Sequence, residues 1–256
     1  MASVTTLKDW LSEQPFMLGL SSGFFGFFAH AGVVSALEHE GLRPYLISGS
    51  SAGALVGALW ASGVSANVIQ QELTSLKRED FWDPGPGLGL LKGRLFRSRL
   101  EQLLVADTFE QCQTKVILSA FDVLANKVKT FSRGPLSPAI HASCAVPFLF
   151  QPVWIGFRPY LDGGVKDRHG ISGIPPEGRL LYHHLASRSP WRRKNSPALK
   201  PPKRKNTVTL IVRDLPRLGP FKLDQASNAF DTAREKTLKA LDEPVKNQNL
   251  PLTIES

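Results

Sequence analysis

Residues 44–63 read PYLISGSSAGALVGALWASG, and this stretch decides the expected fold. Its first five residues, 44–48, form a short apolar run of strand length. Residues 54–61 are small and aliphatic for the most part, which favours a helix ending at Gly63. Between them, residues 49–53 form a G-x-S-x-G pattern. At a strand-to-helix turn, this pattern predicts a nucleophile elbow.

Ser51 is the central serine of that pattern and the predicted nucleophile. A sharp turn projects its hydroxyl away from the backbone, and Gly49 and Gly53 let neighbouring chain pass close by. The following helix directs its positive N-terminal end toward an oxyanion that forms on a substrate. The same small residues can also fill a tight strand–helix turn that carries no chemistry, so both interpretations stand at this point.

The stretch 17–37 precedes the elbow and contains no Asp, Glu, Lys or Arg. Its length would span a bilayer, but glycine, serine and histidine interrupt it. It divides more naturally into a strand at 17–20, a Gly/Ser turn and a helix that stops at Gly41. The chain therefore opens with two strand–turn–helix units, which favour a layered α/β fold.

Elements of both kinds follow the elbow. Strands are expected over 115–121, 128–132, 154–157, 179–183 and 207–212. Helices are expected after Ser65, after Ser98, over 137–143 and over 230–241. Residues 83–89, rich in Pro and Gly, cannot form regular structure and predict a loop of functional length.

The composition is that of one ordinary globular domain, with 256 residues, of which 42% are hydrophobic and 21% charged. These values exclude disordered and fibrous proteins. Cys112 and Cys144 are the only cysteines, and neither has a metal-binding spacing, so no disulfide scaffold or metal site is expected and a reducing compartment is favoured. Residues 1–16 lack a secretory-signal pattern, which makes a cytoplasmic location the expectation.

The positive charge is concentrated in the last third of the chain. Residues 1–165 hold 13 Lys+Arg and 13 Asp+Glu, whereas residues 166–256 hold 18 and 9. Residues 188–205 contain 8 basic residues, 4 prolines and no acid, a composition typical of a solvated loop. Such a segment can also attract anionic lipid headgroups at a membrane surface. A nucleic-acid partner is not expected, because Trp191 is its only aromatic residue and no recognition fold is evident.

A serine nucleophile needs a general base, and Asp162 is one candidate. If a histidine completed a triad with Ser51 and Asp162, the three residues would follow one another along the chain in the Ser–acid–His order of the α/β hydrolases. The histidines in the required position are His169, His183 and His184. Those enzymes place several strands before the elbow, whereas two precede Ser51 here. Because an Asp followed by Gly163 and Gly164 is also an ordinary turn, the residues alone leave the base open.

Several motifs between residues 17 and 165 resemble those of the patatin-like phospholipases in order and spacing. They are AHAGVVSALEHEGL, SGSSAGALVGAL, GLLKGRL, AIHASCAVPFLFQPV and LDGGV. The resemblance implies a hydrolase of lipid acyl esters that uses a Ser–Asp dyad without histidine, metal or cofactor. It identifies Asp162, in the Asp162-Gly163-Gly164 turn, as the catalytic base.

The resemblance also implies a three-layer α/β/α fold around a central, mostly parallel sheet. We expect a single domain over 1–256, with the motif-bearing core at 15–167. The basic loop at 188–205 and a strand and helix over 207–242 follow this core. Both dyad residues should lie on turns at one edge of the sheet. Oligomeric state, headgroup and acyl-chain length are not determined by these motifs.

The glycine-rich oxyanion loop of that family has the form G-G-G-x-R/K-G, and this chain departs from it. Residues 21–26 read SSGFFG, so serines replace the first two glycines and Phe25 replaces the basic residue. Backbone N–H groups remain available, and the oxyanion hole is predicted at Gly23 and Phe24. The lost charge leaves a non-catalytic lipid-binding homologue as an alternative.

Apolar residues near these motifs are candidates for lipid contact. Of Phe24, Phe25, Phe27 and Phe28, at least two are expected to fill the core and the others to wall an acyl-chain pocket. The candidates for an interfacial lid flank the Pro/Gly loop and are Phe81, Trp82, Leu88, Leu90 and Leu91.

Overall fold

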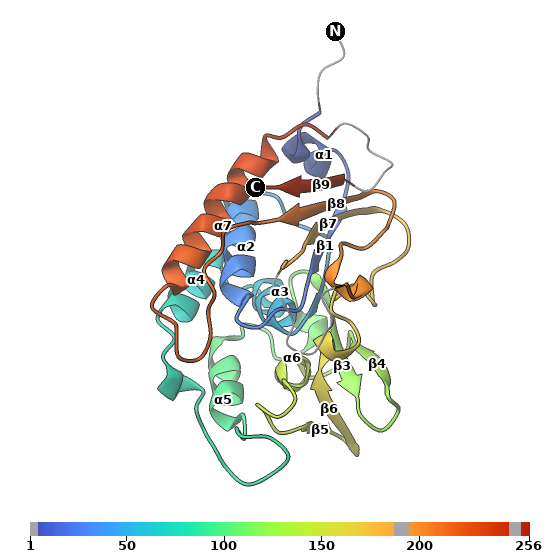
Figure 1. The fold of residues 1–256 in the computed structure, drawn as a ribbon. Coiled ribbons are helices and arrows are strands. Elements are labelled where there is room, and N and C mark those ends of the chain that lie inside the picture. The colour runs from blue at the N-terminus through green and yellow to red at the C-terminus, as the bar shows by residue number, and fades with distance from the viewer. Residues whose placement is uncertain (1–4, 187–194, 246–251) are drawn as a thin grey trace.

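A single sheet with helices packed beside it makes up the computed structural model, which describes residues 5–186, 195–245 and 252–256 (Figure 1). Within these residues the sheet has nine strands. Eight of them follow the order β5-β6-β3-β2-β1-β7-β8-β9, and the ninth, β4, pairs with β3 outside this path. The strands are β1 (Phe16–Leu20), β2 (Leu46–Ser50), β3 (Lys115–Asp122), β4 (Lys127–Phe131), β5 (Val153–Ile155), β6 (Arg158–Asp162), β7 (Arg179–His183), β8 (Thr207–Ile211) and β9 (Leu252–Glu255). The α-helices are α1 (Leu7–Glu13), α2 (Phe27–His39), α3 (Ala52–Ser62), α4 (Ala66–Thr74), α5 (Arg94–Leu103), α6 (Leu136–Cys144) and α7 (Ala226–Leu241).

Most strand pairs in the sheet are parallel. β1 pairs in parallel with β2 and β7, β2 with β3, and β8 with β7 and β9. β4 and β6 run antiparallel to β3, and β5 runs antiparallel to β6. The expected α/β class with a central, mostly parallel sheet is confirmed.

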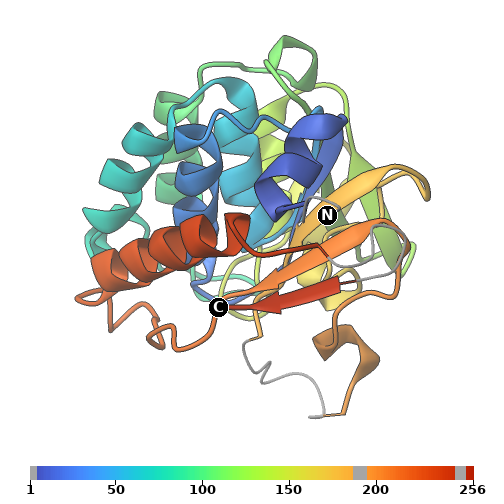
Figure 2. The same cartoon turned by 90° about the horizontal axis from the view of Figure 1, so that it is seen from above.

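Both faces of the sheet are covered, which explains why its central strands are apolar throughout. Leu18 and Leu20 belong to the core cluster on the face where α2, α3, α4 and α7 lie (Figure 2). Met17 points to the other face, where it clusters with Leu180 and Tyr182. Ile171 packs on this second cluster from the segment after β6, so irregular chain covers that side.

One edge of β3 brings two distant segments together. β2 pairs with β3 as far as Ser50, which lies opposite Ser119. β6 continues along the same edge, with Asp162 opposite Ala120. β4 occupies the other edge, because it pairs with the same part of β3. The residue that follows β2 and the last residue of β6 therefore meet end to end.

The uncharged stretch 17–37 forms β1, a turn and most of α2, as expected from its glycines and serines. In the part of the chain that the structure describes, no helix is long and apolar enough to cross a membrane.

The expected helix start at Ser98 is wrong. α5 begins at Arg94, one turn earlier, after Gly93 in a left-handed conformation with φ of 75°. Asp83 accepts hydrogen bonds from the backbone N–H groups of Gly93, Arg94 and Leu95. The capping group comes from ten residues upstream, so the local sequence pattern does not reveal it.

Other boundaries differ because turns and packing decide them. The strand expected over 154–157 is β5, which ends at Ile155 because Gly156 turns the chain toward β6. α7 starts at Ala226 rather than at 230, and α1 and β9 were not expected. Residues 188–194 of the basic segment lie outside the described residues.

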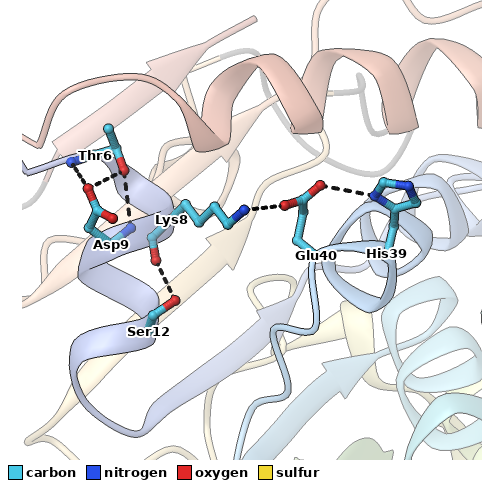
Figure 3. A network of polar contacts seen from close by, with 6 residues as sticks. All are labelled: Thr6, Lys8, Asp9, Ser12, His39 and Glu40. Atoms are coloured by element: carbon cyan, nitrogen blue, oxygen red, sulfur yellow. Dashed lines mark hydrogen bonds and ion pairs between the residues drawn. The ribbon is translucent and has the colours of Figure 1, made fainter.

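Side-chain contacts fix the N-terminal end of α1 (Figure 3). The Thr6 hydroxyl accepts from the Asp9 N–H, and the Asp9 carboxylate accepts from Thr6 N–H, which completes a capping box. Lys8 donates to Glu40 at the end of α2 over 2.5 Å. Glu40 also lies 3.0 Å from a ring nitrogen of His39. These contacts tie the first helix to α2.

Candidate active site

Ser51 lies at the turn between β2 and α3, in a backbone conformation with φ of 53° and ψ of −119°. This is a left-handed value that side-chain-bearing residues rarely adopt. A Cβ on Gly53 would lie 2.2 Å from the carbonyl oxygen of Leu20, and one on Gly49 would lie 2.5 Å from the carbonyl of Gly53. Both glycines are therefore required by the close approach of backbone around the serine.

Asp162 accepts a hydrogen bond from the Ser51 hydroxyl, with 2.5 Å between Oγ and Oδ2. Its other oxygen, Oδ1, accepts from the backbone N–H of Gly164 over 2.7 Å. Both side chains are buried, and the shared edge of β3 sets their approach. A Cβ on Gly163 would lie 2.2 Å from the Ser119 carbonyl oxygen, so the turn also needs this glycine.

Burial raises the pKa of Asp162 from its ordinary value of 3.8 to about 6. The hydrogen bonds from Ser51 and Gly164 and the positive charge of Arg168 oppose this rise by stabilising the carboxylate. A carboxylate with a higher pKa accepts a hydroxyl proton more readily. The environment of Asp162 therefore makes it a stronger base than an exposed aspartate.

Ser143 supports the elbow, and sequence reasoning missed it. Its hydroxyl accepts from the backbone N–H of Ser51 over 2.9 Å and donates to the carbonyl of Ser119 over 2.7 Å. The side chain is fully buried. Ser143 lies within one of the quoted motifs, but its partner is 92 positions away, so only the fold reveals the contact.

The loop at residues 21–26, where the oxyanion hole is predicted, is anchored by its two serines. The Ser21 N–H donates to the carbonyl of His183, and the Ser21 hydroxyl accepts from the Leu185 N–H. The Ser22 N–H donates to the carbonyl of Arg168. Serine in place of glycine at position 21 thus adds a hydrogen bond between the loop and the chain after β7.

Gly23 and Phe24 have backbone N–H groups with no hydrogen-bond acceptor among the described residues. A Cβ on Gly23 would lie 2.5 Å from Cδ1 of the buried Leu185. Gly23 does not have a positive φ, whereas Phe25, at the position of the missing basic residue, does at 54°. Glycine is therefore favoured at position 23 because Leu185 leaves no room for a side chain, and not because of the backbone conformation.

The three candidate triad histidines have other partners. A ring nitrogen of His183 lies 2.8 Å from one of His30, and His30 donates to the Ser21 carbonyl. Because His30 Nε2 donates, its Nδ1 accepts the proton of His183 Nδ1. Burial lowers the pKa of His30 to about 4, so both rings are neutral and support the oxyanion loop.

His184 and His169 bond to the segment 199–200 on the other side of the sheet. His184 donates to the Leu199 carbonyl, and His169 donates to the Lys200 carbonyl. Neither ring forms a hydrogen bond with Ser51 or Asp162 within the described structure.

An apolar cavity of about 130 Å³ opens at Ser51. Phe25 and Phe27 line it and pack on the core, whereas Phe28 is fully buried in the core. Further lining residues from the helices and from the chain after α6 are Leu55, Leu73, Leu100, Leu103, Val146 and Phe150. The lining is mainly apolar, as is typical of sites that bind apolar ligands.

The residues expected to form a lid lie in different environments. Phe81 lines the cavity, and Leu91 is fully buried. Trp82 packs edge-on against Phe221. Leu88 and Leu90 are exposed on the loop itself.

Both cysteines are free thiols. Among the residues described by the structure, no three His, Cys, Asp or Glu side chains are grouped to hold a metal ion.

A model of the patatin-like phospholipase family matches residues 18–173, which include Gly23, Ser51 and Asp162. The chain belongs to this family. An uncharacterized NTE family protein of Mycobacterium bovis is 33% identical over 153 residues, which are 59% of this chain and 42% of that protein. Lysophospholipase NTE1 of Scheffersomyces stipitis is 25% identical over 66% of this chain and 11% of its own length. This patatin-like chain thus spans less than half of these curated relatives.

The crystal structure of VipD from Legionella pneumophila has the same fold. It matches with a TM-score of 0.63 and 14% sequence identity, over 90% of this chain and 67% of VipD. The expected membership of the patatin-like phospholipases and the patatin-like fold are both confirmed.

Proposed function

We propose that this patatin-like protein hydrolyses carboxylic esters of lipids with a Ser51–Asp162 dyad. The observation that carries the proposal is the 2.5 Å hydrogen bond between the two side chains at the opening of an apolar cavity. The partners of His169, His183 and His184 lie elsewhere, which gives no support to a Ser–Asp–His triad.

Acylation begins when Asp162 Oδ2 takes the proton of Ser51 Oγ. The oxygen attacks the ester carbonyl, and the tetrahedral intermediate places its negative charge on the former carbonyl oxygen. As the C–O bond breaks, Asp162 returns the proton to the leaving alcohol, and the acyl group stays on Ser51. Water then gives a proton to Asp162 and attacks the acyl-enzyme, which releases the fatty acid and regenerates Ser51 Oγ–H.

The oxyanion hole is proposed at the backbone N–H groups of Gly23 and Phe24. Their availability for hydrogen bonding and their place in the cavity lining support this assignment. One such donor is worth roughly 3–4 kcal/mol of transition-state stabilisation. These two backbone donors do not depend on the basic side chain that Phe25 replaces.

Phospholipids and lysophospholipids are the proposed substrate class. The family description and the name of the Scheffersomyces stipitis relative, a lysophospholipase, support this choice. The apolar lining of the cavity fits an acyl chain and leaves a polar headgroup outside.

Labelling with a fluorophosphonate probe tests the proposal. We expect wild type to be labelled on Ser51 and Ser51→Ala to remain unlabelled, because the probe reacts with an activated serine. His169→Ala and His184→Ala should still be labelled and should cleave a lysophospholipid. An unlabelled, inactive wild type would support a lipid-binding homologue instead, and loss of labelling in a histidine variant would support a triad.

Gly23→Val is expected to lower kcat roughly a hundredfold or more, the scale expected for losing one oxyanion-hole donor. The added Cβ would displace the oxyanion loop from Leu185 and move the N–H groups away from the carbonyl oxygen. Ester-hydrolysis kinetics measure the loss, and thermal melting of the same sample measures the folded fraction. Wild-type turnover in a folded Gly23→Val protein would place the oxyanion hole elsewhere.

A further inference from the structure

Large apolar side chains are exposed on the loops and on the β5–β6 hairpin at the carboxyl edge of the parallel strands, where the cavity opens. We call this set the apolar rim; its members are Phe24, Leu88, Leu90, Phe148, Trp154 and Phe157. Phe157 is 96% exposed. Burying an aromatic side chain is one of the larger sources of hydrophobic stabilisation, so several exposed together indicate a contact surface.

Backbone hydrogen bonds join the loops of the rim into one structure. The Leu90 N–H donates to the Phe148 carbonyl, and the Gln151 N–H donates to the Leu91 carbonyl. This pairing fixes the Pro/Gly loop against the chain that leads into β5. The rim is therefore held by the same segment that contributes Val146 and Phe150 to the cavity.

The β5–β6 turn extends this surface. Tyr160 lies opposite Asp122, the last residue of β3, so Phe157 lies beyond the end of that strand. The Val123 N–H donates to the Pro159 carbonyl and holds the hairpin to the β3–β4 turn. Figure 1 shows the Pro/Gly loop before α5, the β5–β6 hairpin and the β3–β4 turn at the same end of the molecule.

Positive charge surrounds the rim. Residues 84–99 and 145–161, which supply five of its six members, contain no Asp or Glu. The exposed basic residues of these segments and of the adjoining β3–β4 turn are Lys92, Arg94, Arg99, Lys127 and Arg158. The carboxylates near the rim and in the cavity lining already have partners. Asp83 caps α5 and Asp122 pairs with Arg158. In the cavity lining, Glu72 pairs with Arg99 and Asp80 accepts from the Lys77 N–H.

We propose that the apolar rim and its basic surround dock the cavity mouth onto an anionic lipid surface. This inference rests on the proposed function, because acyl chains reach Ser51 directly only if the bilayer lies against the cavity mouth. Phe24 belongs to both the rim and the cavity lining, which makes the two surfaces continuous. Apolar anchors flanked by Lys and Arg are the combination that interfacial membrane binding requires.

Vesicle co-sedimentation in the Ser51→Ala background tests the docking surface without consuming the lipid. The vesicles contain phosphatidylcholine alone or with phosphatidylglycerol. We expect the triple variant Leu88→Ser, Trp154→Ser, Phe157→Ser to bind anionic vesicles roughly tenfold or more weakly. The triple variant Lys92→Gln, Arg94→Gln, Lys127→Gln should bind about a hundredfold more weakly.

Tyr45→Ser is the matched control, because Tyr45 is exposed immediately before β2, at the opposite edge of the sheet. It should bind anionic vesicles as Ser51→Ala does. Soluble-ester hydrolysis by each rim variant with Ser51 intact should match wild type, so a failed dyad and a failed docking surface give different results. Unchanged vesicle binding in the rim variant would overturn the proposal, as would an equal loss in Tyr45→Ser.

The basic segment 188–205 provides the competing location. Replacing its Lys and Arg residues by Gln should leave most of the vesicle binding in place. If that variant loses binding while the rim variant keeps it, the lipid contact belongs to the segment and the rim proposal is wrong.

Discussion

Ser51→Ala is expected to lower kcat for ester hydrolysis by roughly 10⁴-fold or more, since it removes the proposed nucleophile. The small side chain keeps the elbow backbone, whose glycines and the Ser143 contact do not depend on the hydroxyl. Steady-state kinetics with a soluble ester measure the loss, and circular dichroism verifies the fold.

Asp162→Asn should lose activity to a similar extent, because an amide cannot accept the Ser51 proton. Its carbonyl oxygen can still accept from the Gly164 N–H, so the turn is preserved. In wild type, kcat/KM should rise with pH through about 6 as Asp162 ionises. Substantial activity in either variant, at any pH, would contradict the dyad.

Asp162→Asn is also expected to stabilise the fold at pH 8 by about 3 kcal/mol. Burial raises the pKa of Asp162 from 3.8, its value in the unfolded chain, to about 6. Between these values the folded state binds more protons than the unfolded state, so stability falls as pH rises. The free-energy cost of burying the ionised Asp162 carboxylate is constant well above pH 6 and disappears below pH 3.8.

Urea unfolding of wild type and Asp162→Asn at pH 8 and at pH 3.5 measures this difference. The Asp162→Asn protein should be more stable than wild type at pH 8, and the difference in the free energy of unfolding should disappear at pH 3.5. Asp122→Asn is the control, and it should destabilise the fold at pH 8. Hydrogen bonds from Ala125 and Arg158 lower the pKa of the Asp122 carboxyl, so its ionised form stabilises the folded state. An Asp162→Asn protein that is less stable than wild type at pH 8 would show that the ionised Asp162 carboxylate does not destabilise the folded state.

Such a result would connect function with stability at one residue. A carboxylate made basic by desolvation is unfavourable to the folded state for the same reason that it is useful to a nucleophile. We expect the core of β1, β2 and α3 to offset that cost through apolar burial.

The central elements were predictable because their signals are local. The G-x-S-x-G segment is flanked by an apolar run and a run of small residues, and strand, turn and helix follow one another within twenty residues. Residues 17–37 were resolved in the same way, since glycine and serine stop a strand and permit a turn. The true start of α5 escaped prediction because it depends on the Asp83 side chain, ten residues before the helix.

The sequence by itself determined the family and the elbow, because their motifs are marked by residue type and order, and through the family resemblance it offered Asp162 as the base. Only the tertiary structure decided that Ser51 and Asp162 meet, since β2 and β6 must share one edge of β3, at Ser119 and Ala120. It also decided the partners of the histidines, the role of Ser143 and the raised pKa of Asp162. Those properties arise from burial and from contacts between residues that lie 15 to 153 positions apart in the chain, which no local pattern encodes.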